Sequence, residues 1–106
     1  MTLTEYKVVY SPEAFEDLKS IYRYIAIDLQ EMETAKNQTE RIRRTIRDLS
    51  VFPEKHKIVD WKPWSDMNMR QVPVNNYVAF YLVDNEKKIV TVTRIFYGGR
   101  DIRKLI

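Results

Sequence analysis

Three strand-like runs follow one another in residues 67–96, which read MNMRQVPVNNYVAFYLVDNEKKIVTVTRIF. The runs cover residues 67–74, 77–83 and 88–96, and they are rich in the β-branched and aromatic side chains that strands favour. Asn-Asn and Asp-Asn pairs separate the runs, and both residue types tolerate the left-handed backbone of tight turns. The sequence therefore predicts three strands that pair as an antiparallel meander.

The middle and last runs carry apolar side chains in alternation. Successive residues of the middle run place Val78, Phe80 and Leu82 on one face and Tyr77, Ala79 and Tyr81 on the other. This pattern predicts a central strand covered by helices on one face and by a tail or a partner on the other. Strict alternation in the last run also puts Arg94 on the same face as Val90, Val92 and Phe96.

A strand and a helix are predicted before this meander. Residues 4–10 alternate with the period of two that is typical of a strand. Ser11-Pro12 then places a capping hydroxyl before a proline at the first helical position, so a helix should begin here. The helix is expected to bury one apolar stripe, made of Phe15, Leu18, Tyr22, Ile25 and Leu29, with Ile21 beside it. A tight connection or a bend is expected at residues 30–33.

A second helix is predicted over residues 34–50. Its apolar positions are Ala35, Ile42, Ile46 and Leu49, and Lys36, Arg43 and Arg47 fall together roughly 130° around the helix. Such a basic face is either a solvated helix surface or a nucleic-acid site. The resulting order is β-α-α-β-β-β. It predicts an α+β fold in which a two-helix hairpin packs on a small antiparallel sheet, as one domain over residues 1–106.

The composition is that of an ordinary globular protein of 106 residues, with 44% hydrophobic and 31% charged residues. No apolar run approaches the roughly 18 residues of a membrane span, and no signal-peptide core is evident, so we expect a cytoplasmic protein. The chain has no cysteine and one histidine, which argues against a metal site and predicts no cofactor.

The formal net charge of +3 is distributed unevenly. Residues 36–57 and 87–106 are the two basic segments, and they could merge into one positive surface if the fold brings them together. A polyanion or an acidic protein would be the natural partner of such a surface.

A short glycine-containing segment, RIFYGGRD, occupies residues 94–101. Gly98 and Gly99 are expected to take positive φ, to end the last strand abruptly and to hold Tyr97 and Arg100 at a fixed edge. Arginines that flank an aromatic ring suit phosphate binding, although a turn with solvated arginines has the same pattern.

The order of elements and four segments together resemble the RelE/ParE superfamily of bacterial toxins from type II toxin-antitoxin systems. The segments are residues 14–26, 42–53, 70–81 and 94–101. RelE-like members cut messenger RNA in the ribosomal A site, whereas ParE-like members poison DNA gyrase. RelE-like toxins usually have an arginine just after the aromatic residue that opens the second strand of the central hairpin. Val78 occupies that position here, so the chain resembles the ParE-like branch more closely.

The resemblance implies candidate site residues for each branch. A RelE-like ribonuclease works without a metal and needs groups that move a proton and hold phosphorane charge. Its candidates here are Arg70, Tyr97 and Arg100. The candidate target-binding residues are Arg43, Arg47, Lys55, Lys57, Arg94 and Arg103. Arg94 has a structural alternative, in which it faces a carboxylate.

The resemblance also implies partners. The target would be DNA gyrase or the ribosome with its mRNA, and an acidic antitoxin would neutralise the toxin in a hetero-oligomeric complex. We expect an antitoxin helix or strand on the outer face of residues 77–83 or on the first helix pair. A basic module that binds nucleic acid without toxicity is the third possibility, and its affinity should fall steeply with salt.

Overall fold

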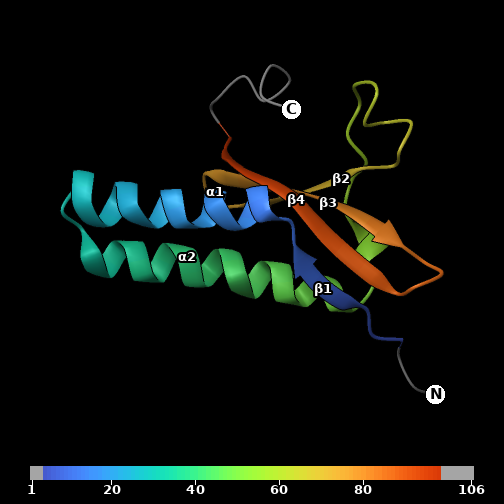
Figure 1. Cartoon of the computed structure of the whole chain (residues 1–106), viewed down its shortest axis with the longest axis horizontal. Coiled ribbons are helices and arrows are strands. Elements are labelled where there is room, and N and C mark those ends of the chain that lie inside the picture. Colours follow the sequence, from blue (N-terminus) through green and yellow to red (C-terminus); the bar gives the residue numbers. More distant parts are fainter. Residues whose placement is uncertain (1–3, 99–106) are drawn as a thin grey trace.

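The computed structural model of the chain describes residues 4–98, and the expected order of elements is confirmed (Figure 1). The main elements are β1 (Lys7–Tyr10), α1 (Pro12–Arg23), α2 (Met32–Arg47), β2 (Arg70–Val74), β3 (Tyr77–Asp84) and β4 (Ile89–Tyr97). A π-helical turn, η1 (Tyr24–Asp28), follows α1, and two 3₁₀ turns, η2 (Asp48–Ser50) and η3 (Pro53–Lys55), follow α2. No helix within residues 4–98 is long and apolar enough to span a membrane.

The four strands form one sheet in the order β1-β4-β3-β2. The predicted meander is confirmed, because β2 pairs with β3 and β3 pairs with β4 in antiparallel fashion. β1, however, runs parallel to β4, with Lys7 opposite Ile89 and Tyr10 opposite Val92. The sheet is therefore mixed rather than wholly antiparallel. A parallel pair needs a long crossover connection, which the helices and the meander supply here.

A bulge in β4 corrects the predicted faces of that strand. Phe80 lies opposite Arg94 while Tyr81 lies opposite Val92, so Thr93 is the extra residue that reverses the alternation. Val92 consequently packs in the cluster beneath the helices, whereas Phe96 packs on the opposite face of the sheet. Strict alternation had predicted that Arg94 and Val92 share a face. This prediction is wrong, because the bulge places them on opposite faces.

The helical hairpin begins as expected and then departs from the predicted stripe. The Ser11 hydroxyl accepts the Ala14 N–H at 3.0 Å and caps α1. Ala14, Leu18 and Ile25 are buried, but Phe15 and Leu29 are half exposed. In η1 the Leu29 N–H donates to the Tyr24 carbonyl, an i→i+5 bond that inserts an extra residue and moves Leu29 off the buried face. Phe15 precedes this turn, and its neighbour Ala14 faces the core in its place.

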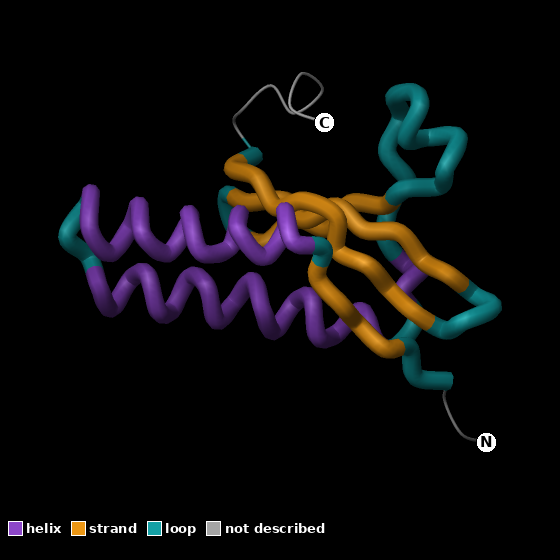
Figure 2. The backbone as a smooth tube through the Cα atoms, viewed as in Figure 1, coloured by secondary structure: helices purple, strands orange, loops and turns teal. Residues whose placement is uncertain are grey.

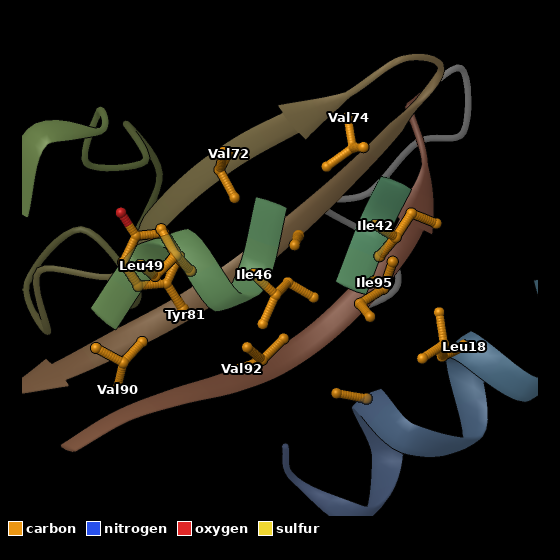
Figure 3. Close-up of a cluster of buried hydrophobic side chains, with 12 residues drawn as sticks. Leu18, Ile42, Ile46, Leu49, Val72, Val74, Tyr81, Val90, Val92 and Ile95 are labelled. Carbon is orange, nitrogen blue, oxygen red and sulfur yellow. The ribbon is translucent and has the colours of Figure 1, made fainter. Parts of the chain in front are cut away.

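The main core lies between the helical hairpin and one face of the sheet (Figure 3). Its buried members are Ala14, Leu18, Ile42, Ile46, Leu49, Val72, Val74, Ala79, Tyr81, Val90, Val92 and Ile95. A second cluster on the other face consists of Val59, Met69, Phe80 and Phe96, with Trp61, Trp64, Val78 and Leu82 packed against it. The loop between α2 and β2 (Figure 2) supplies this second cover, not the tail or partner that the sequence had suggested.

Tyr81 joins the main core to the loop. Its side chain is fully buried, and its hydroxyl donates to the Pro53 carbonyl at 2.6 Å. Burial is the main reason that the pKa of Tyr81 is raised to about 12.

This raised pKa predicts a loss of stability at alkaline pH. The phenol holds its proton more tightly in the folded chain than in the unfolded chain, so its contribution is complete below about pH 10 and disappears as the pH rises through about 12. We expect the wild type to lose about 2–3 kcal/mol more unfolding free energy than Tyr81→Phe across this interval. Urea unfolding at several pH values measures the difference. Parallel pH profiles for the two proteins would contradict the assignment.

Candidate functional site

A cavity of about 910 Å³ lies between the helical hairpin and the adjoining ends of β3 and β4. We call it the hairpin groove. Its lining residues are Asp17, Ser20, Ile21, Tyr24, Ile25, Leu29, Glu31, Thr34, Gln38, Asn76, Tyr77, Arg94, Ile95, Phe96 and Tyr97. The outer ends of α1 and α2 extend beyond the sheet in Figure 1.

Aromatic and aliphatic side chains in the hairpin groove remain available for contact. Tyr24, Leu29 and Tyr97 are each about half exposed. Tyr97 packs edge-on against Tyr77, with 5.8 Å between ring centroids, and burial raises the pKa of Tyr77. Half-exposed apolar side chains around a concave surface are typical of a binding site for an apolar segment.

A buried amide adds a polar feature to the same groove. The side-chain oxygen of Gln38 accepts a hydrogen bond from Asn75 at 3.2 Å, whereas its Nε2 is buried and has no partner within residues 4–98. An unpaired buried donor costs free energy until a ligand acceptor reaches it. Because Nε2 is buried, an acceptor from a partner segment would reach it only if the Gln38 side chain turned outward.

One wall of the groove is held by Asp17, which bridges α1 and β4. Its carboxylate accepts hydrogen bonds from Arg94 Nε at 2.8 Å, from Arg94 Nη2 at 3.1 Å and from the Ile95 N–H at 2.9 Å. β1 pairs no further along β4 than Val92, so Asp17 satisfies an edge amide that β1 does not reach. The hydrogen bond to Asp17 raises the pKa of Arg94, and the guanidinium lies 4.3 Å from the Phe96 ring. Arg94 therefore faces a carboxylate, which is the structural role that the sequence analysis gave as the alternative to target binding.

Gly98 lies at the end of the groove, and its predicted positive φ is wrong. Its N–H donates to the Asn76 carbonyl at 2.7 Å, and a Cβ at this position would lie 3.2 Å from that oxygen. Glycine is favoured here by close backbone approach rather than by a left-handed turn. Gly99, Arg100 and Arg103 lie outside the described residues.

Arg70 is anchored to the loop that precedes β2. Its Nη1 donates to the carbonyls of Glu54 and His56 at 2.9 and 2.7 Å, and its Nη2 lies 3.4 Å from the Glu54 carboxylate. Only 15% of its side chain is exposed. Lys55 and Lys57 are exposed on the same loop. Burial, with help from the nearby Lys55 and Arg70 charges, lowers the pKa of His56.

The register of the sheet keeps Arg70 away from Tyr97. Arg70 lies opposite Tyr81 and Tyr97 lies opposite Tyr77. Four residues of β3 separate these two positions, which corresponds to about 13 Å along the strand. The structure therefore does not bring these two predicted catalytic residues together.

Arg43 and Arg47 lie on another side of the molecule, where two shallow hollows follow the junction of α1, α2 and β1. We call this surface the outer seam. Its lining residues are Tyr10, Phe15, Leu18, Lys19, Tyr22, Arg23, Thr39, Arg43 and Arg47. It shares no lining residue with the hairpin groove, to which Arg94 belongs. Arg94 therefore lies apart from the Arg43 and Arg47 face of α2.

Sequence reasoning named Arg94 and Tyr97 of the groove, and Arg43 and Arg47 of the outer seam. It missed the groove residues Tyr24, Leu29 and Gln38, and the seam residues Tyr10, Phe15, Lys19, Tyr22 and Arg23. Fading of the apolar stripe after Leu29 was the available signal for the groove. Nothing in the helical periodicity indicated that Phe15 would lie at the seam.

Comparison with known proteins gives the family. The sequence matches the family described as ParE toxin of type II toxin-antitoxin system, parDE, over residues 8–102. No curated protein sequence matches the chain. A solved structure of the chromosomal ParDE toxin-antitoxin system from P. aeruginosa is similar, with a TM-score of 0.71 and 18% identity, over 89% of this chain and 97% of that one.

Two solved RelE-type complexes share the fold as well. The RelBE2 toxin-antitoxin complex from Mycobacterium tuberculosis has a TM-score of 0.62 and 18% identity, over 91% of this chain and 94% of that one. The archaeal RelE-RelB complex from Pyrococcus horikoshii OT3 has a TM-score of 0.62 and 17% identity, over 91% and 98%. Because the family match spans most of the sequence, the chain belongs to the ParE toxin family of type II toxin-antitoxin systems.

Proposed function

We propose that this toxin inhibits growth in the cytoplasm by acting on DNA gyrase, and that a cognate acidic antitoxin neutralises it. The separation of Arg70 from Tyr97 supports this choice over a ribonuclease. Metal-independent RNA cleavage needs a proton-transfer group and a cation around one phosphate. Arg70 is committed to the Glu54 and His56 carbonyls, and Arg94, which lines the groove with Tyr97, is committed to Asp17.

The second candidate function is a RelE-like, ribosome-dependent endoribonuclease. Tyr97 favours it, because its phenol is half exposed in a groove and is available for proton transfer. A phenol acts as a base only when neighbouring cations stabilise its anion. Under this alternative, Arg100 would have to supply that charge.

Tyr97→Phe separates the two candidates. A gyrase toxin does not need the phenolic proton, so we expect the variant to inhibit growth within about twofold of the wild type. A ribonuclease that used Tyr97 for proton transfer would lose about 10²–10⁴-fold in cleavage rate. Primer extension on cellular transcripts and growth after induction measure both properties at matched expression.

A direct assay with gyrase tests the target. We expect the purified toxin to trap gyrase-DNA cleavage complexes and to leave ribosome-bound transcripts intact. Unchanged supercoiling and no trapped complexes would exclude the gyrase proposal. Codon-linked cleavage that Tyr97→Phe abolishes would establish the ribonuclease instead.

The hairpin groove is our proposed site for the antitoxin. Its half-exposed Tyr24, Leu29 and Tyr97 suit the apolar face of a helix. The first helix pair was one of the two surfaces expected from the sequence. The other, the outer face of β3, is less accessible, since the loop with Trp61 and Trp64 packs against it.

A further inference from the structure

The outer seam differs chemically from the hairpin groove. Four of its nine lining residues are cations, three are aromatic, and no carboxylate lines either hollow. The hairpin groove, by contrast, is lined by Asp17 and Glu31 as well as by Arg94. Lys19 and Arg23 form ion pairs with Glu16 and Arg47 forms one with Glu40, but all these side chains are exposed and such pairs are weak. The seam is therefore suited to an anionic partner that replaces these carboxylates, whereas the groove is suited to an apolar one.

Arg43 occupies the centre of the seam, since it lines both hollows, which measure about 320 and 350 Å³. Its side chain is exposed and forms no hydrogen bond or ion pair with another residue of the described range. Arg47 follows one turn later on α2, so the two Cβ atoms are about 5–6 Å apart. Its partner, Glu40, is exposed, and an exposed pair of this kind is weak enough for a ligand to replace.

The aromatic residues of the seam lie beside these cations. Burial raises the pKa of Tyr10, the nearby Arg43 and Arg47 charges oppose this shift, and the Glu40 carboxylate adds to it. The Tyr10 hydroxyl thus remains a hydrogen-bond donor next to two guanidinium groups. Phe15 is half exposed, and Lys19 Nζ lies 5.0 Å from its ring centroid.

From this arrangement we infer that the outer seam binds a single strand of nucleic acid, with Arg43 and Arg47 on successive phosphates and Phe15 as a stacking surface for a base. Guanidinium groups bind phosphate oxygens in bidentate fashion, and exposed aromatic rings between cations are the usual platform for unpaired bases. Polyglutamate, which has no apolar or aromatic side chain, would use the cations but would gain little from the exposed ring. A duplex would keep its bases stacked and away from Phe15.

The test is fluorescence anisotropy with a labelled oligothymidylate of about 12 nucleotides, a length within the range of single-strand sites. The double variant Arg43→Gln/Arg47→Gln should bind at least about tenfold more weakly. Its slope of log affinity against log salt should be shallower by about 1.4, because two phosphate contacts on a single strand are lost. Phe15→Ala should weaken binding at least about fivefold at unchanged charge.

The matched control is Arg41→Gln/Arg44→Gln. These arginines are also exposed on α2 and line neither hollow, so the control removes the same charge from the same helix. It should weaken binding by less than about threefold, because only the long-range field changes. Circular dichroism and thermal melting should show that all variants remain folded, since each substituted side chain is exposed or half exposed.

Several results would overturn the inference. They are no binding of the oligonucleotide by the wild type, equal losses in the two double variants, or duplex DNA that binds as tightly as the single strand. Polyglutamate that binds with the same dependence on Arg43 and Arg47, and no dependence on Phe15, would assign the seam to an acidic protein. The assay contains no gyrase, ribosome or antitoxin, so its failure leaves the proposed function untouched.

Discussion

Replacing Asp17 with asparagine is expected to lower the free energy of unfolding by about 2–3 kcal/mol. The carboxylate accepts three hydrogen bonds, two from Arg94 and one from the Ile95 N–H. An asparagine has one acceptor oxygen, and its NH₂ group would face the guanidinium. The side chains of Asp17 and Arg94 are 15% and 31% exposed, so water only partly replaces what is lost.

Glu16→Gln is the matched control for this prediction. Glu16 is the preceding residue of α1, and its ion pairs with Lys19 and Arg23 are exposed. Removing its charge should change stability by no more than about 0.5 kcal/mol. Urea unfolding monitored by tryptophan fluorescence measures both variants. Equal stabilities of the two variants would show that the Asp17 bridge is worth no more than a surface ion pair.

The local sequence pattern was sufficient to predict which helices and strands form. It was not sufficient to predict which residues of each element face the core. Ser11-Pro12 marked the start of α1 because capping and a fixed proline φ are properties of the chain itself. The bulge at Thr93 and the π-helical turn at Tyr24–Asp28 each add one residue to a regular repeat. Such insertions depend on contacts between distant segments, so the alternation of β4 and the stripe of α1 misled the prediction.

The parallel pairing of β1 with β4 could not be predicted from the local sequence pattern either. Residues 4–10 have the same alternation in either strand direction, and only the path of the chain through the helices decides between them. The cover on the outer face of β3 was missed for a similar reason. Trp61 and Trp64 belong to a polar loop whose destination is set by the apolar surface of Phe80 and Phe96.

The sequence predicted which residue types belong to the candidate site. It did not predict which of these residues the fold brings together. Arg43 and Arg47 share a helical face, which follows from the 3.6-residue period alone. Whether Arg70 and Tyr97 meet depends instead on strand register, which separates them along β3. Arg94 carried the same ambiguity, since only the docking of α1 brings Asp17 to it. The predicted catalytic set of Arg70, Tyr97 and Arg100 therefore depended on tertiary contacts that the sequence pattern does not determine.

Leu29→Glu is expected to abolish neutralisation by the antitoxin while leaving the toxin folded and toxic. Leu29 lines the hairpin groove and is already 51% exposed, so a glutamate costs the free protein little. In the complex the new carboxylate would be buried against the apolar face of the antitoxin segment, without a cation to pair with it. We expect the affinity for the cognate antitoxin to fall at least about 100-fold, or about 2.7 kcal/mol.

Ile27→Glu provides the comparison that makes this result specific to the groove. Ile27 is two residues away on η1, is more exposed than Leu29 and does not line the groove, yet the substitution introduces the same charge. Isothermal titration with the purified antitoxin and growth rescue by its co-expression should both separate the two variants. If Ile27→Glu is the one that escapes neutralisation, the antitoxin binds the tip of the hairpin. Full rescue of both variants would place its main contacts elsewhere on the toxin, because neither the groove nor the tip would then contribute.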